Sequence, residues 1–154
     1  MKERVIALGF FDGVHLGHGA LLRRAAEEAA LRGCTPAVFT FDRPPKEVVT
    51  GVPCPLINSP EDRRDLVRRL YRIQDVLMVP FDREMMTTPW DDFIVRILVG
   101  RYHAVHLVAG HDHHFGHRNQ GTPELLAQKC AQLGLGCDII PKVEQDGITI
   151  SSTY

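Results

Sequence analysis

Two histidines, His15 and His18, are the residues best suited to chemistry in this sequence. They lie three positions apart, so on a helix both imidazoles are on the same face. Gly17 stands between them and has no side chain, which lets a ligand approach the backbone closely. The first turn of a helix also offers unpaired N–H groups and a partial positive charge, and both favour an anion. The pattern therefore predicts a site for phosphate.

The residues on either side of this pair predict the elements that position it. The apolar run at residues 5–8 indicates a short buried strand, and Gly9 and Gly13 indicate a tight turn. A helix is expected over residues 15–32, ending at Gly33.

The expected first helix has one apolar face, because small and apolar residues recur at a spacing of four: Leu21, Leu22, Ala25, Ala26, Ala29 and Ala30. Arg23 with Glu27, and Arg24 with Glu28, are i, i+4 pairs that we expect on the solvent side.

Farther along the chain, strand-like apolar runs alternate with helical patterns. We expect strands at residues 36–41, 76–79, 104–109, 138–140 and 148–150, and a helix at 124–133. This alternation predicts an α/β fold: a Rossmann-like open parallel sheet with helices on both faces.

Three Ser-Pro or Thr-Pro pairs predict helix starts, with the hydroxyl residue as N-cap and proline at the first helical position: Ser59-Pro60, Thr88-Pro89 and Thr122-Pro123. Residues 42–60 contain five prolines and little periodicity, which indicates a long loop of the kind that often covers a binding site.

Composition excludes several classes of function. The 154 residues suit one domain, and the formal net charge of −1 gives no field that would attract nucleic acid or an anionic membrane. No apolar run reaches the roughly 20 residues of a membrane span. The N-terminus has no signal-peptide pattern, and the four cysteines lack metal-binding spacing, so we expect reduced thiols and a cytoplasmic location. The sequence contains no pattern that indicates an oligomeric state.

Three polar segments follow predicted strands and would meet at one sheet edge if all these strands are parallel. They are the His15–His18 pair, the segment from Gly110 to His117, and Ser151-Ser152-Thr153. Their convergence is a stronger indication than any one of them, and it predicts a ligand site at the carboxyl ends of the strands.

The string Gly9-Phe10-Phe11-Asp12-Gly13-Val14-His15-Leu16-Gly17-His18 resembles the signature of the nucleotidylyltransferase (HxGH) superfamily. Its F-D-G-V-H-x-G-H form is similar to the FMN adenylyltransferase module of bacterial FAD synthetases. Gly110 to Gly116 resembles the family's G-x-[DN]-F-x-F-G loop, and Ile150 to Thr153 its I-S-S-T motif. The resemblance covers essentially residues 1–154 as one domain, without the riboflavin kinase module that usually follows.

The resemblance implies transfer of AMP from ATP to FMN, giving FAD and pyrophosphate, with Mg²⁺ accompanying ATP. The expected partners are these small molecules, with no nucleic acid and no membrane. His15 and His18 would be catalytic. The nucleotide would be bound by Gly9, Phe10, Phe11, Asp12, Gly17, Gly110, Asp112, Ser151, Ser152 and Thr153. Flavin contacts are expected from Asp42, Pro45 and Phe115. Asp12 has two open roles, near the metal or as a turn-former.

The chain departs from the family pattern at three positions. Pro44 stands where the family has the histidine of Pro-His-Pro, His113 replaces an aromatic residue, and Thr149 replaces an arginine. Two alternatives stay open: another nucleotidylyltransferase, namely a cytidylyltransferase or a pantetheine-phosphate adenylyltransferase, or a nucleotide- or flavin-binding module without turnover.

A second cluster of histidines raises the question of a metal. His111, His113, His114 and His117 lie within seven positions, a density that can bind zinc or nickel. No cysteine pattern completes such a site, so we interpret the cluster as solvated, with at most one ring directed at the substrate.

Overall fold

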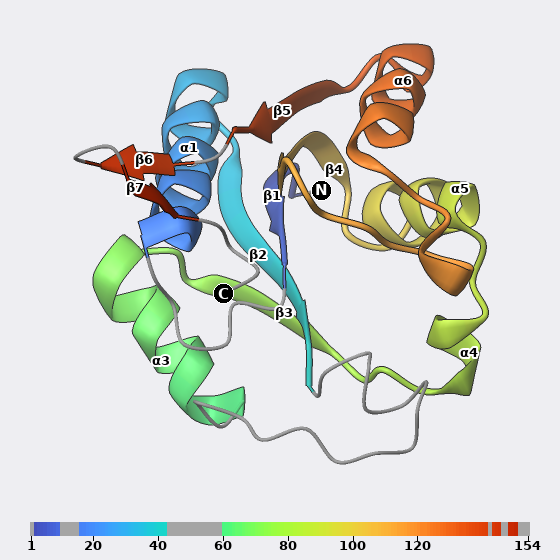
Figure 1. Cartoon of the computed structure of the whole chain (residues 1–154), viewed down its shortest axis with the longest axis horizontal. Coiled ribbons are helices and arrows are strands. Elements are labelled where there is room, and N and C mark those ends of the chain that lie inside the picture. Colours follow the sequence, from blue (N-terminus) through green and yellow to red (C-terminus); the bar gives the residue numbers. More distant parts are fainter. Residues whose placement is uncertain (1, 10–15, 43–59, 142, 146–147, 151–154) are drawn as a thin grey trace.

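The computed structural model describes residues 2–9, 16–42, 60–141, 143–145 and 148–150. Its centre is a five-stranded sheet in the order β3-β2-β1-β4-β5, with every neighbouring pair parallel (Figure 1). The strands are β1 (Arg4–Leu8), β2 (Thr35–Phe41), β3 (Asp75–Val79), β4 (Ala104–Gly110) and β5 (Gly136–Ile140). The order reverses between β1 and β4, as in a Rossmann-like sheet, so the predicted fold class is confirmed.

Helices cover both faces of this sheet (Figure 1). Helices α1 (Leu16–Arg32) and α3 (Pro60–Tyr71) pack on one face, where Leu22 and Val67 join Val5 and Ala7 of β1 in one buried cluster. The other face is covered by α6 (Pro123–Leu133) and by a segment around residue 95. Successive residues of β1 therefore enter different cores, as expected for a strand buried on both sides.

The first helix begins within one residue of its expected start and ends as predicted. Gly33 follows it with φ +67°, a left-handed conformation that suits glycine. Thr122 is confirmed as the N-cap of α6, because its Oγ1 accepts a hydrogen bond from the Leu125 N–H at 3.2 Å.

The prediction that Thr88 caps a helix is wrong. Its hydroxyl instead donates to the Glu84 carbonyl at 2.8 Å, so it closes the short helix α4 (Arg83–Met86) that precedes it. The next helix, α5 (Trp90–Asp92), has Pro89 at its N-cap position without a side-chain cap. It continues as a π-helical segment, η1 (Phe93–Val99), whose wider turn buries Phe93, Ile94, Ile97 and Leu98.

The strand predicted at residues 148–150 forms, but its place in the sheet was predicted wrongly. β7 (Ile148–Ile150) pairs antiparallel with β6 (Val143–Gln145) in a separate two-stranded sheet, beside α1 in Figure 1. A two-residue connection between them permits antiparallel pairing, whereas a parallel pair needs a long crossover. The described helices include none with the length and apolar character needed to cross a membrane.

Candidate functional site

A pocket of about 210 Å³ opens beside the carboxyl ends of β1, β2 and β4. Gly9 directly follows β1 and lies in its wall, and the Gly9 N–H donates to the Phe39 carbonyl at 3.3 Å. In open parallel sheets ligands bind at this edge, next to the strand-order reversal. The pocket therefore lies at the sheet edge where the sequence predicts a ligand site, and of the three polar segments expected there the 110–117 loop contributes to its wall.

Aromatic side chains dominate the pocket. Phe39 packs edge-on against Phe41 at 5.5 Å and against Phe93 at 5.4 Å between ring centroids. The remaining lining residues are Leu8, Gly9, Phe81, Met85, His113, His114, Phe115, Gly116 and Asn119. A cavity with apolar walls and a few polar groups suits a flat aromatic ring that carries hydrogen-bonding atoms.

His113 is the most perturbed titratable group of this pocket. Its ring stacks on Phe115, with 5.8 Å between centroids and an interplanar angle of 15°. Burial lowers the pKa of His113 to about 4, with His114 adding to the effect and Asp112 opposing it. At neutral pH His113 is therefore an uncharged ring, a polar substitute for the aromatic residue that the family pattern has there.

The loop after β4 is held in shape by its backbone. Phe115 and Gly121 exchange two hydrogen bonds, at 3.2 and 2.8 Å, and this bridge fixes the Phe115 ring in the pocket wall. Gly116 has φ +78° and packs so closely on Trp90 that a Cβ there would lie 2.6 Å from Trp90 Cα. Glycine is required at this position both for its backbone conformation and for space.

Asp42 follows β2 and connects two strand ends. Its Oδ1 accepts a hydrogen bond from the Phe81 N–H at 3.1 Å, and its own N–H donates to the Val79 carbonyl at 3.1 Å. The carboxylate thus orients a pocket-lining phenylalanine. A direct contact between Asp42 and a flavin stays a prediction.

The structure brings some of the predicted site residues together. Gly9 and Phe115 line the pocket, and Gly110 ends β4 close by. Asp112 lies in the turn after β4, where its carbonyl oxygen is 2.9 Å from His114 Nδ1. Gly17 and His18 lie in the first turn of α1, which directly follows the β1–α1 connection. Outside the described residues are Phe10, Phe11, Asp12, His15, Pro45, Ser151, Ser152 and Thr153.

The histidines of the 111–117 loop have separate environments. His113 stacks on Phe115, His114 is exposed, and the His117 backbone N–H donates to the Thr88 carbonyl at 2.8 Å. Sequence reasoning missed the pocket residues Phe41, Phe81 and Phe93. The available signal for Phe41 and Phe81 was a phenylalanine at, or just after, the end of the second and third strands. Phe93 lies in η1 and had no comparable signal.

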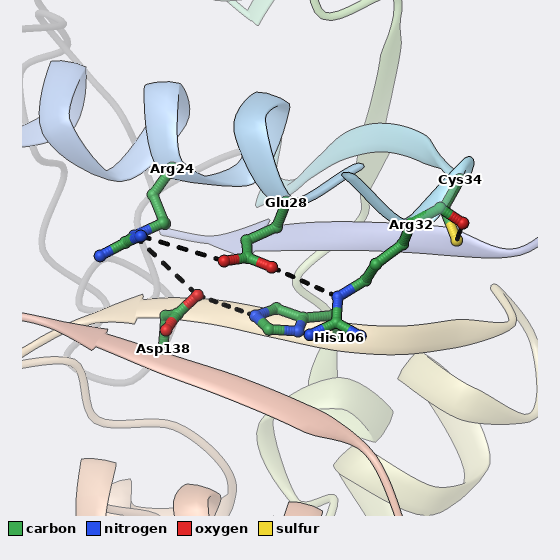
Figure 2. Close-up of polar contacts among 6 residues, drawn as sticks. All are labelled: Arg24, Glu28, Arg32, Cys34, His106 and Asp138. Carbon is green, nitrogen blue, oxygen red and sulfur yellow. Dashed lines mark hydrogen bonds and ion pairs between the residues drawn. The ribbon is translucent and has the colours of Figure 1, made fainter. Parts of the chain in front are cut away.

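A polar cluster on the α1 face of the sheet was also missed. Figure 2 shows Glu28 of α1, His106 of β4 and Asp138 of β5 pointing toward one another, with Arg24 and Arg32 beside them. The Glu28 side chain is only 15% exposed, so the prediction that it lies on the solvent side is wrong. It faces β4 and β5, where charged groups provide partners.

Comparison with known proteins shows which family the chain matches. The model of the FAD synthetase family matches residues 1–154. Two curated relatives are bifunctional riboflavin kinase/FMN adenylyltransferases, from Listeria monocytogenes (33% identity over 98% of this chain) and Bacillus subtilis (32% over 99%). Each match covers 48% of the relative, so the chain spans about half the length of these proteins.

A solved structure has the same fold. It is described as a macrolide-efflux protein from Streptococcus pneumoniae and superposes with a TM-score of 0.82 at 27% identity. The match covers 99% of this chain and 49% of the other. The fold is therefore similar over nearly the whole of this chain.

Proposed function

The chain belongs to the FAD synthetase family, and from this premise we propose that it is an FMN adenylyltransferase, which makes FAD and pyrophosphate from FMN and ATP. The observation that carries the proposal is the aromatic pocket at the carboxyl ends of the strands. The pocket suits the isoalloxazine ring of FMN, and the start of α1 suits a phosphate.

In the proposed reaction an FMN phosphate oxygen attacks the α-phosphorus of ATP. A bond forms between that oxygen and the α-phosphorus, while the bond from the α-phosphorus to the bridging oxygen breaks and pyrophosphate leaves. The nucleophile is already an anion, so no covalent enzyme intermediate is needed. Catalysis would then rest on positioning and on the stabilisation of charge on the phosphates.

His15 and His18 would supply much of that stabilisation by donating hydrogen bonds to the transferred and leaving phosphates. N–H groups of the first turn of α1 would add to it. Gly17 would leave room for the phosphates, and Ser151, Ser152 and Thr153 would bind them from a second side. Gly9 and Gly110 end neighbouring strands and would flank the nucleotide.

Mg²⁺ is the metal expected with ATP. Mg²⁺ prefers oxygen ligands and keeps several bound waters. The protein therefore needs to supply only one carboxylate ligand beside the triphosphate. Asp112 offers such a carboxylate in the turn after β4, and Asp12 is a second candidate. The ion would neutralise charge on the triphosphate.

The experiment is to incubate the protein with FMN, ATP and Mg²⁺ and to separate the products by chromatography. We expect FAD and pyrophosphate in equal amounts. If no FAD forms but calorimetry shows that FMN binds, the protein is a binding module without turnover. Pyrophosphate released only with CTP, or only with another phosphate ester, would indicate a different nucleotidylyltransferase.

A further inference from the structure

We propose that Glu28, His106 and Asp138 form a binding site for a divalent transition-metal ion such as Zn²⁺. One donor atom from each residue lies within 4.8 Å of the other two. The residues come from α1, β4 and β5, so an ion bound here would tie the helix to two neighbouring strands (Figure 2).

The donor set fits the chemistry of this metal. Zn²⁺ binds imidazole nitrogen and carboxylate oxygen at about 2.0–2.2 Å, which places neighbouring donors of a tetrahedral site about 3.4 Å apart. His106 Nε2 and Asp138 Oδ2 are 2.9 Å apart, so they would have to move only slightly farther apart to bind the same ion. Glu28 has the longest side chain of the three and would close the remaining distance by a rotamer change.

The burial of the His106 ring is the second observation. Its side chain is only 4% exposed, and the buried Nδ1 has no hydrogen-bond partner among the described residues. Buried ring nitrogens in proteins normally have partners, because an unsatisfied one costs about 1–3 kcal/mol. Nδ1 lies against Gly136, so the nitrogen that would bind the ion is Nε2, which is 2.9 Å from Asp138 Oδ2. The unpaired Nδ1 is therefore not itself part of the proposed site.

Gly136 leaves the space that the His106 ring occupies. A Cβ added at Gly136 would collide with the His106 imidazole, so the absence of a side chain there lets the ring lie between β5 and α1. The ring fills this space with only 4% of the side chain exposed, and such burial gives the preorganisation that a metal ligand needs.

Two arginines reach the same carboxylates from the solvent side. Arg32 Nε is 3.3 Å from Glu28 Oε2, and Arg24 Nε is 4.0 Å from Asp138 Oδ2. Their side chains are 45% and 48% exposed, so they can withdraw into water when an ion enters. They would compete with a metal for the carboxylates.

The site is separate from the aromatic pocket. His106 lies on the sheet face covered by α1, whereas Phe39, Phe93 and Phe115 of the pocket belong to the core of the opposite face. A bound ion would therefore stabilise the fold without taking part in the proposed reaction.

The test uses the whole chain prepared without a histidine tag, with Co²⁺ as the spectroscopic probe and Zn²⁺ for thermal melting. We expect uptake of about one Co²⁺ per chain, with visible absorption bands typical of a tetrahedral site, and a rise in Tm with Zn²⁺. Glu28→Gln and Asp138→Asn should lose both signals. Asp92→Asn is the matched control, since Asp92 forms an ordinary ion pair with Arg96 at 3.9 Å, and it should keep them.

A further variant separates a metal site from an ion-pair network. Arg32→Gln removes a competing cation and should strengthen Zn²⁺ binding several-fold, whereas unchanged binding would count against the proposal. The proposal is overturned if the wild-type chain takes up no Co²⁺, or if Glu28→Gln and Asp138→Asn keep the spectrum. Loss of the spectrum in a His111→Ala/His117→Ala variant would likewise overturn it, because the ion would then belong to the loop.

Discussion

Asp42 Oδ1 accepts a hydrogen bond from the Phe81 N–H at 3.1 Å, and this contact joins the end of β2 to the segment after β3 at the pocket wall. The bond links residues 39 positions apart. Its acceptor is a charged carboxylate, which makes it stronger than a bond between neutral groups.

Asp42→Ala should lower the free energy of unfolding by about 1–3 kcal/mol, because the Phe81 N–H loses its acceptor. The Phe81 ring would also lose its orientation, so the KM for FMN should rise. Asp42→Asn is the control, since its amide oxygen can still accept the bond. Urea unfolding and steady-state kinetics check both effects. If Asp42→Asn lost as much activity as Asp42→Ala, the carboxylate itself would be contacting substrate.

His18→Ala should reduce FAD formation by roughly 10²–10³-fold, the usual effect of removing one donor to a developing charge. His18 lies in the first turn of α1, where a small replacement is compatible with a helix, so the circular dichroism spectrum should stay the same. His103→Asn is the matched control, because His103 precedes β4 at the opposite end of the sheet and asparagine tolerates its φ of +58°. Wild-type turnover in His18→Ala would refute the assignment.

Stability should fall as pH is lowered toward 4, partly because of His113. Its pKa is lowered from 6.5 to about 4 in the folded protein, so the unfolded chain binds more protons between these values. The contribution of His113 to the free energy of unfolding is complete above pH 6.5. It decreases as pH falls toward 4, by at most about 3 kcal/mol. Urea unfolding at several pH values checks this. His113→Phe should give a flatter profile, and parallel profiles for the two proteins would contradict the argument.

Gly116→Ala should cost about 1–3 kcal/mol of stability and should also weaken FMN binding, because the added Cβ pushes the loop away from Trp90. Gly33→Ala is a close control. Gly33 has a similar φ of +67° but open space around it, so it carries the backbone strain without the clash. We expect Gly33→Ala to lower the melting temperature and to leave FMN affinity unchanged in calorimetry. Equal FMN affinity in the two variants would show that the packing on Trp90 does not shape the pocket.

Much of the fold could be predicted from the sequence, because its strands are continuous apolar runs and its first helix has a regular apolar face. Val5 to Leu8 is an example, since burial on both sides leaves no polar residue in the run. The failures have a common cause. Thr88 and the strand at residues 148–150 were interpreted from local patterns, but their hydrogen bonds are decided by neighbours that the pattern does not include.

The polar cluster around His106 shows the same limit. Nothing local distinguishes a histidine that faces a helix from one that faces water, and Glu28 fits a solvent-exposed ion pair as well as a buried one. The available signal was a histidine within an apolar strand, two positions after Ala104. The site residues near His15 and His18 could be proposed because their motif is formed by adjacent positions, whereas the aromatic pocket is assembled from five separate segments.

The parallel pairing of the sheet has a consequence for how the chain folds. β1 is central and pairs with both β2 and β4, so Arg4 acquires its partner Ala104 only after the 99 residues between them have been synthesised. None of the five strands can form a hairpin with its neighbour as a local nucleus. During translation β1 would therefore have one unpaired edge and an exposed apolar face for most of the synthesis of the domain. Chaperones bind exposed apolar surface of this kind.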